Sequence, residues 1–150
     1  PGMITVAGIQ SPGLTAAPAV ALMVKEILKG HRLRLNKRRA FRPRRTAIVR
    51  LADQDATGRE KLIRRDPEYG DIVCRCEMVS VAEIRDAVRR GARTLDGVKF
   101  RTRAQAGRCH GCFCTTRIME IMAEELGVPV TEIVKNSPES KVVLGRTREI

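Results

Sequence analysis

Hydrophobic and polar positions alternate differently in successive parts of the chain. Residues 3–9 are apolar and rich in β-branched side chains, a pattern that predicts a short strand. Apolar positions over residues 16–29 cover most of a helical face, and Gly30 ends the predicted helix. We expect Pro18 in the first turn of this helix, where its missing N–H costs least. Residues 31–45 have no period and predict an extended linker.

Two weaker signals follow the basic stretch. Residues 46–51 alternate between two faces and predict a short strand. Residues 59–65 predict a helix of one or two turns. This helix should end before Asp66, because the residue before Pro67 is disfavoured in the helical region.

The helical pattern becomes clear after residue 71. Ser80 and Glu83 have the spacing of a capping box, which predicts a helix that runs to about Arg90. Thr94 is in place to cap a second helix that runs to about Thr102.

A third helix is predicted from around Phe113 to Gly127, with Pro129 beyond it. Its apolar positions fall on one stripe, formed by Ile118, Ile121, Met122 and Leu126. Residues 131–135 predict a final short helix, and residues 137–150 show little pattern.

These elements predict a mainly α protein with minor β structure. We expect a strand–loop–helix at residues 1–30, a basic linker at residues 31–70, a small helical domain at residues 71–136 and a tail at residues 137–150. Aromatic residues make up 3% of the 150 residues and tryptophan is absent, so the core must consist of aliphatic side chains and methionine. No run of about 18 apolar residues predicts a membrane span.

The charge of the chain is strongly positive and unevenly distributed. The net charge is +12, and no acidic residue lies between Glu26 and Asp53. That interval holds a dense set of basic residues: Arg32, Arg34, Lys37, Arg38, Arg39, Arg42, Arg44 and Arg45. Such a segment can bind nucleic acid or pack on an acidic protein surface. Nucleic acid is the less favoured partner, because Phe41 is the segment's one aromatic residue and no nucleic-acid motif surrounds it.

Five cysteines form two groups, which 32 residues separate: Cys74 and Cys76, then Cys109, Cys112 and Cys114. Two close groups of soft thiolates in one small fold are what a metal centre needs. A disulfide framework is disfavoured, because the count is odd, the groups are tight and no apolar secretory segment opens the chain. The cysteines are therefore expected to be reduced, which favours a cytoplasmic location.

Zinc and an iron–sulfur cluster are the two alternatives for this centre. Structural zinc usually uses two Cys-x-x-Cys pairs about 15–20 residues apart, whereas here the first pair has a single spacer. A 2Fe–2S cluster divides four thiolates between two irons, so uneven groups suit it. We expect both groups at helix starts, where free amides and the helix dipole stabilise negative sulfur. Arg75, Arg108 and Arg117 would add positive potential.

Residues 66–77 and 102–111 resemble the 2Fe–2S domain of the bacterioferritin-associated-ferredoxin (BFD) type, over about residues 66–136. In particular, they resemble the version fused to the C-terminus of FAD-dependent glycerol-3-phosphate dehydrogenase-like proteins. The stand-alone domain closes with Cys-x-x-Cys and the fused version with Cys-x-x-x-x-Cys. The resemblance to the fused version implies four ligands, Cys74, Cys76, Cys109 and Cys114, with Cys112 as the alternative to Cys114.

Residues 7–19 are similar to the last flavin-contacting segment of the same oxidoreductases. The resemblance implies that FAD in the parent enzyme contacts Gly8, Ile9, Ser11, Gly13, Leu14 and Thr15. Glycines allow close backbone approach, and amides at a helix start favour negative charge on a reduced flavin.

The nucleotide-binding fingerprint Gly-x-Gly-x-x-Gly is not found in the chain, so we expect a C-terminal piece or a subunit of a longer enzyme. This chain alone is expected not to be catalytic. Its partners would be the FAD and substrate portion, or a partner subunit, and an electron acceptor. The expected function is to pass electrons from reduced flavin to that acceptor. The alternative is a zinc-stapled basic module that binds nucleic acid or an acidic protein.

Overall fold

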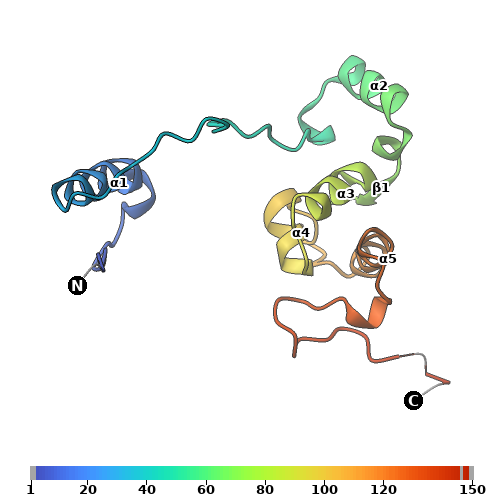
Figure 1. Cartoon of the computed structure of the whole chain (residues 1–150). Helices are drawn as coiled ribbons and strands as arrows, with labels where there is room; N and C mark the ends of the chain where they lie inside the picture. The colour runs from blue at the N-terminus through green and yellow to red at the C-terminus, as the bar shows by residue number, and fades with distance from the viewer. Residues whose placement is uncertain (1–2, 146, 149–150) are drawn as a thin grey trace. The chain divides into compact units, whose positions relative to one another are not determined.

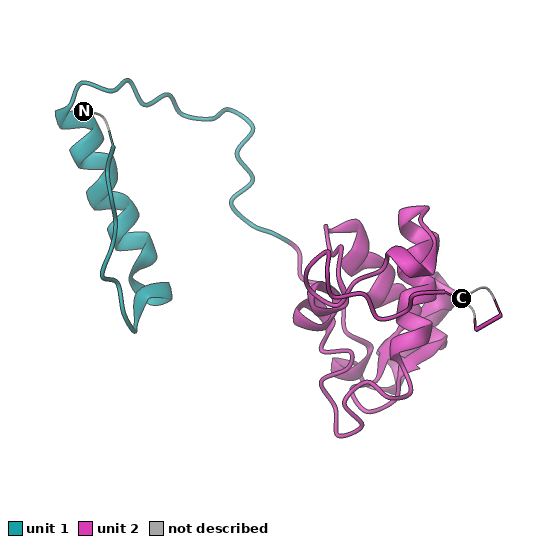
Figure 2. Ribbon diagram, turned by 90° about the horizontal axis from the view of Figure 1, so that it is seen from below, with its two compact units in different colours: residues 1–45 teal, residues 46–150 magenta. Residues whose placement is uncertain are grey.

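The computed structural model describes residues 3–145 and 147–148, and the chain divides into two compact units (Figure 2). The first unit ends at Arg45 and the second begins at Thr46. Five α-helices and one two-stranded sheet lie within the described residues. The predicted class, mainly α with minor β, is confirmed.

The first unit contains one helix, α1 (Gly13–Gly30), which confirms the predicted helix and begins three residues before it (Figure 1). Because of this earlier start, Pro18 lies beyond the first turn, and its predicted position was wrong. The predicted strand at residues 3–9 was also wrong, since these residues are irregular. A strand needs a neighbour for its backbone groups, and the described part of this unit offers no second strand.

Residues 31–45 contain only turns and irregular chain, and every one of them is exposed. This agrees with the lack of periodicity in their sequence. The arginines and lysines of the segment therefore lie in water within this unit, as their desolvation cost requires.

The second unit begins with short helices. The strand predicted at residues 46–51 was wrong: residues 46–50 are irregular, and Leu51–Asp53 form a 3-10 helix, η1. Leu51 is buried against Leu62 and Tyr69. Helix α2 (Ala56–Arg65) confirms the helix predicted at residues 59–65.

Helix α2 starts earlier than predicted because Asp55 caps it. The Asp55 carboxylate accepts a hydrogen bond from the Gly58 amide at 2.7 Å. A second 3-10 helix, η2 (Pro67–Gly70), follows and leads into the sheet.

The sheet pairs β1 (Ile72–Cys74) with β2 (Val79–Ser80) in antiparallel register. Helix α3 (Val81–Arg89) starts directly after it. The capping box is confirmed: the Glu83 amide donates to Ser80 Oγ at 3.4 Å, and the Ser80 amide donates to Glu83 Oε2 at 3.0 Å.

Helices α4 (Leu95–Thr102) and α5 (Thr115–Leu126) confirm the other two predicted helices. Thr94 Oγ1 accepts from the Gly97 amide at 3.0 Å, and Gly127 ends α5 with φ +67°. The helix predicted at residues 131–135 is only a 3-10 turn, η3 (Val130–Glu132). Val134 beyond it forms an antiparallel bridge with Lys141, so a helix cannot continue there.

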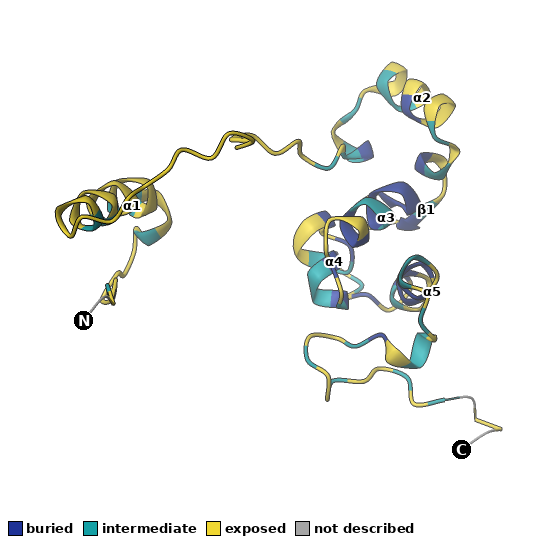
Figure 3. Cartoon of the chain, viewed as in Figure 1, coloured by how far each residue is buried: buried dark blue, intermediate teal, exposed yellow. Residues whose placement is uncertain are grey.

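Helix α3 packs against both α4 and α5, and Figure 3 shows buried residues on all three helices. The main core cluster contains no aromatic residue, as the composition predicted, whereas the smaller cluster contains the buried Tyr69. The fully buried members of the main cluster include Val79, Ile84, Val88, Val98, Ile118 and Met122. No helix among the described residues is long and apolar enough to cross a bilayer.

Candidate metal centre

The first cysteine group lies at the turn of the small sheet. Cys74 ends β1 and is 1% exposed, whereas Cys76 lies in the exposed turn that leads to β2. Met78 in the same turn has φ +50°, a left-handed conformation that reverses the chain tightly. The prediction that this group lies at a helix start was wrong, because β2 separates it from α3.

The second cysteine group lies in successive turns between α4 and α5. Cys114 is the residue that precedes the first turn of α5, so this group does lie at a helix start, as predicted. Cys114 is 1% exposed, Cys109 is half-buried and Cys112 is exposed. The Cys112 amide donates to the Cys109 carbonyl at 3.0 Å, which holds this turn closed.

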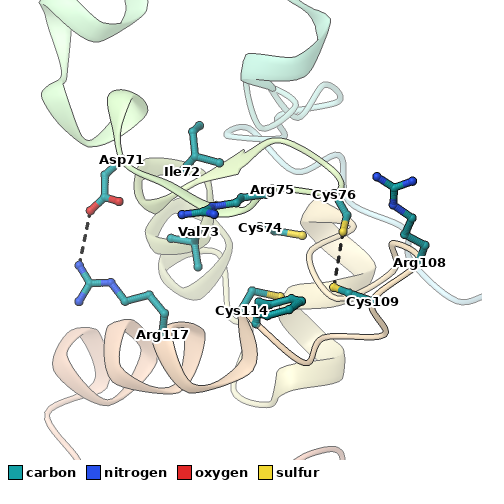
Figure 4. Close-up of a pocket in the computed structure, with 11 residues that line it drawn as sticks. Asp71, Ile72, Val73, Cys74, Arg75, Cys76, Arg108, Cys109, Cys114 and Arg117 are labelled. Atoms are coloured by element: carbon teal, nitrogen blue, oxygen red, sulfur yellow. Dashed lines mark hydrogen bonds and ion pairs between the residues drawn. The ribbon is translucent and has the colours of Figure 1, made fainter.

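The two groups meet at one pocket of about 600 Å³ (Figure 4). Four of the cysteines line it: Cys74, Cys76, Cys109 and Cys114. The Sγ atoms of Cys76 and Cys109 are 3.5 Å apart. Cys112 is not among the lining residues. Within the described residues, no three His, Cys, Asp or Glu side chains are grouped so as to hold a single ion.

Gly107 brings the two groups together. A Cβ atom at this position would lie 2.2 Å from Cys76 Cβ and 3.2 Å from its Sγ. Real Cβ atoms essentially never approach other atoms so closely, so only glycine lets the second group pack on the first.

A second contact between the groups could not be predicted from the sequence. Arg103, just beyond α4, donates to the Glu77 carboxylate at 2.8 Å and so ties the first cysteine turn to that helix. Gln105 Nε2 donates to Thr115 Oγ1 at 2.6 Å and links the two ends of the second cysteine segment. Arg103 and Gln105 both have positive φ without being glycine, so no local sequence signal marks them.

Three arginines line the pocket, as the sequence suggested. Arg117 is paired with Asp71 at 3.4 Å and with Glu120 at 3.5 Å. Arg75 and Arg108 are exposed and form no ion pair with any residue that the structure describes. Their charge is therefore free to act on an anion in the pocket.

The thiols of the pocket differ in acidity. Burial raises the pKa of Cys114 to about 11, and the neighbouring Cys74 contributes to the increase. Hydrogen bonds from the backbone amide of Gly111 and from the Cys76 thiol lower the pKa of Cys109. A metal that binds all four sulfurs must therefore displace protons, and the buried Cys114 holds its proton more tightly than an ordinary thiol.

The residues predicted to contact FAD lie in the other unit, in the loop before α1 and in its first turn. Five of them are exposed and Gly13 is half-buried: a Cβ there would lie 2.9 Å from Ile9 Cγ2. Gly8 has φ +70°, which favours glycine. The role of this segment in FAD binding stays a prediction.

Residues 72–124 match the family model described as "BFD-like [2Fe-2S] binding domain". The matched stretch contains all five cysteines. This part of the chain therefore belongs to the family of BFD-like iron–sulfur domains.

The chain as a whole is similar to oxidoreductase sequences. It is 45% identical over 149 residues to a glycerol 3-phosphate dehydrogenase from Caloramator mitchellensis. The matched stretch covers 98% of this chain and 31% of that protein. It is 33% identical over 81 residues to the A1 subunit of the anaerobic glycerol-3-phosphate dehydrogenase of Haloferax volcanii, covering 54% of this chain and 14% of that protein.

A third relative is the HcnB subunit of the hydrogen cyanide synthase of Pseudomonas aeruginosa. It is 35% identical over 98 residues, with 65% of this chain and 19% of that protein covered. The chain thus spans less than a third of the length of these relatives. No solved structure matches it. The resemblance to glycerol-3-phosphate dehydrogenase-like proteins with a BFD-like domain is confirmed.

Proposed function

We propose that this chain is the electron-transfer part of an FAD-dependent oxidoreductase related to glycerol-3-phosphate dehydrogenase. A 2Fe–2S cluster, when bound, accepts and releases one electron at a time. The observation that carries the proposal is the convergence of four cysteines from two distant groups on one pocket. The thiolates of this pocket are the ligand type that iron–sulfur clusters require. The match to BFD-like domains also supports a 2Fe–2S cluster.

The proposed ligands are Cys74, Cys76, Cys109 and Cys114. The proposal prefers Cys114 to Cys112 because Cys114 is buried and lines the pocket, whereas Cys112 is exposed and does not. Gly107 and the Arg103–Glu77 pair hold the two groups in contact, so these residues would shape the site without binding the metal.

The surroundings of the pocket suit an anionic cluster. Four thiolates and two bridging sulfides give a 2Fe–2S centre a net negative charge, which increases on reduction. Arg75 and Arg108, which have no acidic partner among the described residues, place two positive charges at the pocket, and the amide of Gly111 donates to Cys109. These groups would favour the reduced form of the cluster and so raise the reduction potential of the cluster.

For the first unit we propose contact with FAD in the parent enzyme, through Gly8, Ile9, Ser11, Gly13, Leu14 and Thr15. The glycines leave the backbone open to a ligand, and the free amides at the start of α1 favour negative charge on a reduced flavin. The electrons would come from the FAD and substrate portion of the same protein or from a partner subunit, and would leave to an acceptor. We also propose a cytoplasmic location, because cysteines that bind a metal must stay reduced.

Metal analysis and spectroscopy of the anaerobically purified chain test the cofactor. We expect a brown-red protein whose electron paramagnetic resonance (EPR) signal appears on reduction with dithionite. The C112S variant should keep the signal and C114S should lose it. A colourless protein that holds one tightly bound zinc would contradict the proposal and favour the basic interaction module.

The flavin step needs the longer parent protein. Photoreduction of its bound flavin should be followed by the EPR signal of the reduced cluster, and the C114S variant should retain the reduced flavin without that signal. A flavin that reduces while the intact cluster stays oxidised would contradict the proposed electron path.

A further inference from the structure

The four pocket cysteines fall into two pairs, and each pair takes one residue from each cysteine group. Cys76 and Cys109 form the outer pair, with Sγ atoms 3.5 Å apart in the part of the pocket open to solvent. Cys74 and Cys114 form the inner pair, because each is 1% exposed and both line the same pocket. Figure 4 shows the outer pair joined across the two loops that carry it.

The outer pair has the separation that one metal ion needs. Two sulfurs bound to the same tetrahedral metal at ~2.3 Å lie about 3.8 Å apart. The 3.5 Å between the Sγ atoms of Cys76 and Cys109 is close to this value. The two cysteines that are placed to share one iron therefore come from different cysteine groups, and not from neighbouring positions in the sequence.

We propose, resting on the proposed function, that Cys76 and Cys109 hold one iron and Cys74 and Cys114 the other, and that the electron taken up on reduction resides on the outer iron. The balance of the step is simple: one electron from the donor converts the outer ferric ion to ferrous, and the inner ion stays ferric. No bond is broken and no proton is transferred.

Solvation favours the outer site for the added negative charge. A charge in water is stabilised far more than a charge in a core, and the inner pair is part of the aliphatic cluster around α3 and α5. Cys76 is exposed and Cys109 is half-buried, so water reaches the outer pair.

Hydrogen bonds and fixed charge act in the same direction. Cys109 receives hydrogen bonds from the backbone amides of Gly111 and Phe113, whereas Cys114 receives one from Gln105. Arg108 precedes Cys109 directly, lines the pocket and has no acidic partner among the described residues. These donors and this cation stabilise the more negative state of the metal beside Cys109.

The location of the electron matters for transfer. The outer pair shares the pocket with Phe113, which is 86% exposed. An electron on the outer iron would therefore lie on the side of the cluster that a redox partner can approach.

Three single Cys→Ser variants of the full chain test the assignment. Serine oxygen is a harder ligand than thiolate and stabilises ferric over ferrous iron. C76S and C109S should therefore lower the reduction potential and change the EPR g-values of the reduced cluster. C74S, where it retains the cluster, should keep g-values near those of the wild type. The reverse pattern would overturn the inference.

A measurement on the wild-type protein does not depend on variants that fail to assemble. In the proton NMR spectrum of the reduced cluster, cysteine β-protons on ferrous iron shift further on warming, while those on ferric iron shift less. We expect the β-protons of Cys76 and Cys109 to show the ferrous behaviour. Those of Cys74 and Cys114 should show the ferric behaviour. The signals of Cys114 can be assigned through its contacts with α5. Ferrous behaviour at the inner pair, or in one member of each pair, would overturn the inference.

The two proposals fail differently. A 2Fe–2S cluster with its electron on the inner iron would overturn this inference and leave the proposed function intact. A chain that binds no such cluster would overturn the proposed function and this inference with it.

Discussion

The two units of the chain use apolar residues in opposite ways. In the first unit α1 has no buried residue, and Leu22, Met23 and Ile27 are exposed on it. In the second unit α3, α4 and α5 bury their apolar stripes against one another. A periodic apolar pattern therefore predicts that a helix forms, but it does not say what covers the helix. The second unit has its own core, whereas the described part of the first unit leaves the apolar residues of α1 uncovered.

The largest expected effect comes from removing a core side chain. Ile118→Ala in α5 should lower the free energy of unfolding of the second unit by about 2–5 kcal/mol, because it leaves a cavity in a fully buried site. The matched change Ile27→Ala in α1 should alter it by less than about 0.5 kcal/mol. Urea denaturation followed by circular dichroism measures both. Equal losses would mean that α1 shares the core of the second unit.

Gly107→Ala should disrupt the cysteine pocket. The new methyl group would occupy the space of Cys76 Cβ, and overpacking of this kind costs about 1–3 kcal/mol. Because Cys76 would have to move, the iron content should also fall. The control is Gly30→Ala at the end of α1, where no atom lies within 4 Å of the added carbon. Normal iron content in the Gly107 variant would refute the role given to this glycine.

Ser80→Ala tests the cap that connects the sheet to α3. Ser80 Oγ donates to Glu83 Oε2 at 2.7 Å, and both residues are buried. Loss of the hydroxyl should cost about 1–2 kcal/mol and lower the melting temperature. The exposed Thr116→Ala in α5 serves as the control and should have almost no effect. A melting temperature unchanged by Ser80→Ala would contradict the capping role.

The smallest effect concerns pH. Hydrogen bonds from Arg89 and Arg85 hold the pKa of Glu125 below its usual value. Because the pKa of Glu125 is lower in the folded protein than in the unfolded chain, the ionised carboxylate stabilises the fold at any pH above the pKa of the unfolded chain. This contribution is lost as the pH falls through the pKa of the folded protein. Glu125→Gln should therefore cost roughly 1 kcal/mol near neutral pH, after allowance for solvent screening, and nothing in strong acid.

Glu60 provides the matched control, because it forms an exposed ion pair with Arg64 in α2. Glu60→Gln should show no measurable pH dependence in the same thermal unfolding series. If Glu125→Gln behaves like Glu60→Gln at every pH, the ion pairs of Glu125 with Arg85 and Arg89 add no stability to α3 and α5.

Features fixed by neighbouring residues could be predicted from the sequence. Ser80 with Glu83, Thr94 and Gly127 mark helix ends through local hydrogen bonds and backbone conformation, and the three helices they delimit were predicted within two residues. The strands predicted at residues 3–9 and 46–51 were wrong, because a strand depends on a partner that no local pattern specifies.

The same division holds at the candidate metal centre. The cysteine groups and the nearby arginines are visible in the sequence, because residue type and spacing are local. The contact of Gly107 with Cys76, the Arg103–Glu77 ion pair and the pairing of sulfurs across the two groups are not, because they depend on how distant loops pack.

Native mass spectrometry of the anaerobically purified chain tests the central claim most directly. The account predicts a mass that includes about two irons and two sulfides per chain, retained in C112S and lost in C114S. A mass that includes a single zinc, or a C112S variant that loses the metal while C114S keeps it, would contradict the four-cysteine cluster site.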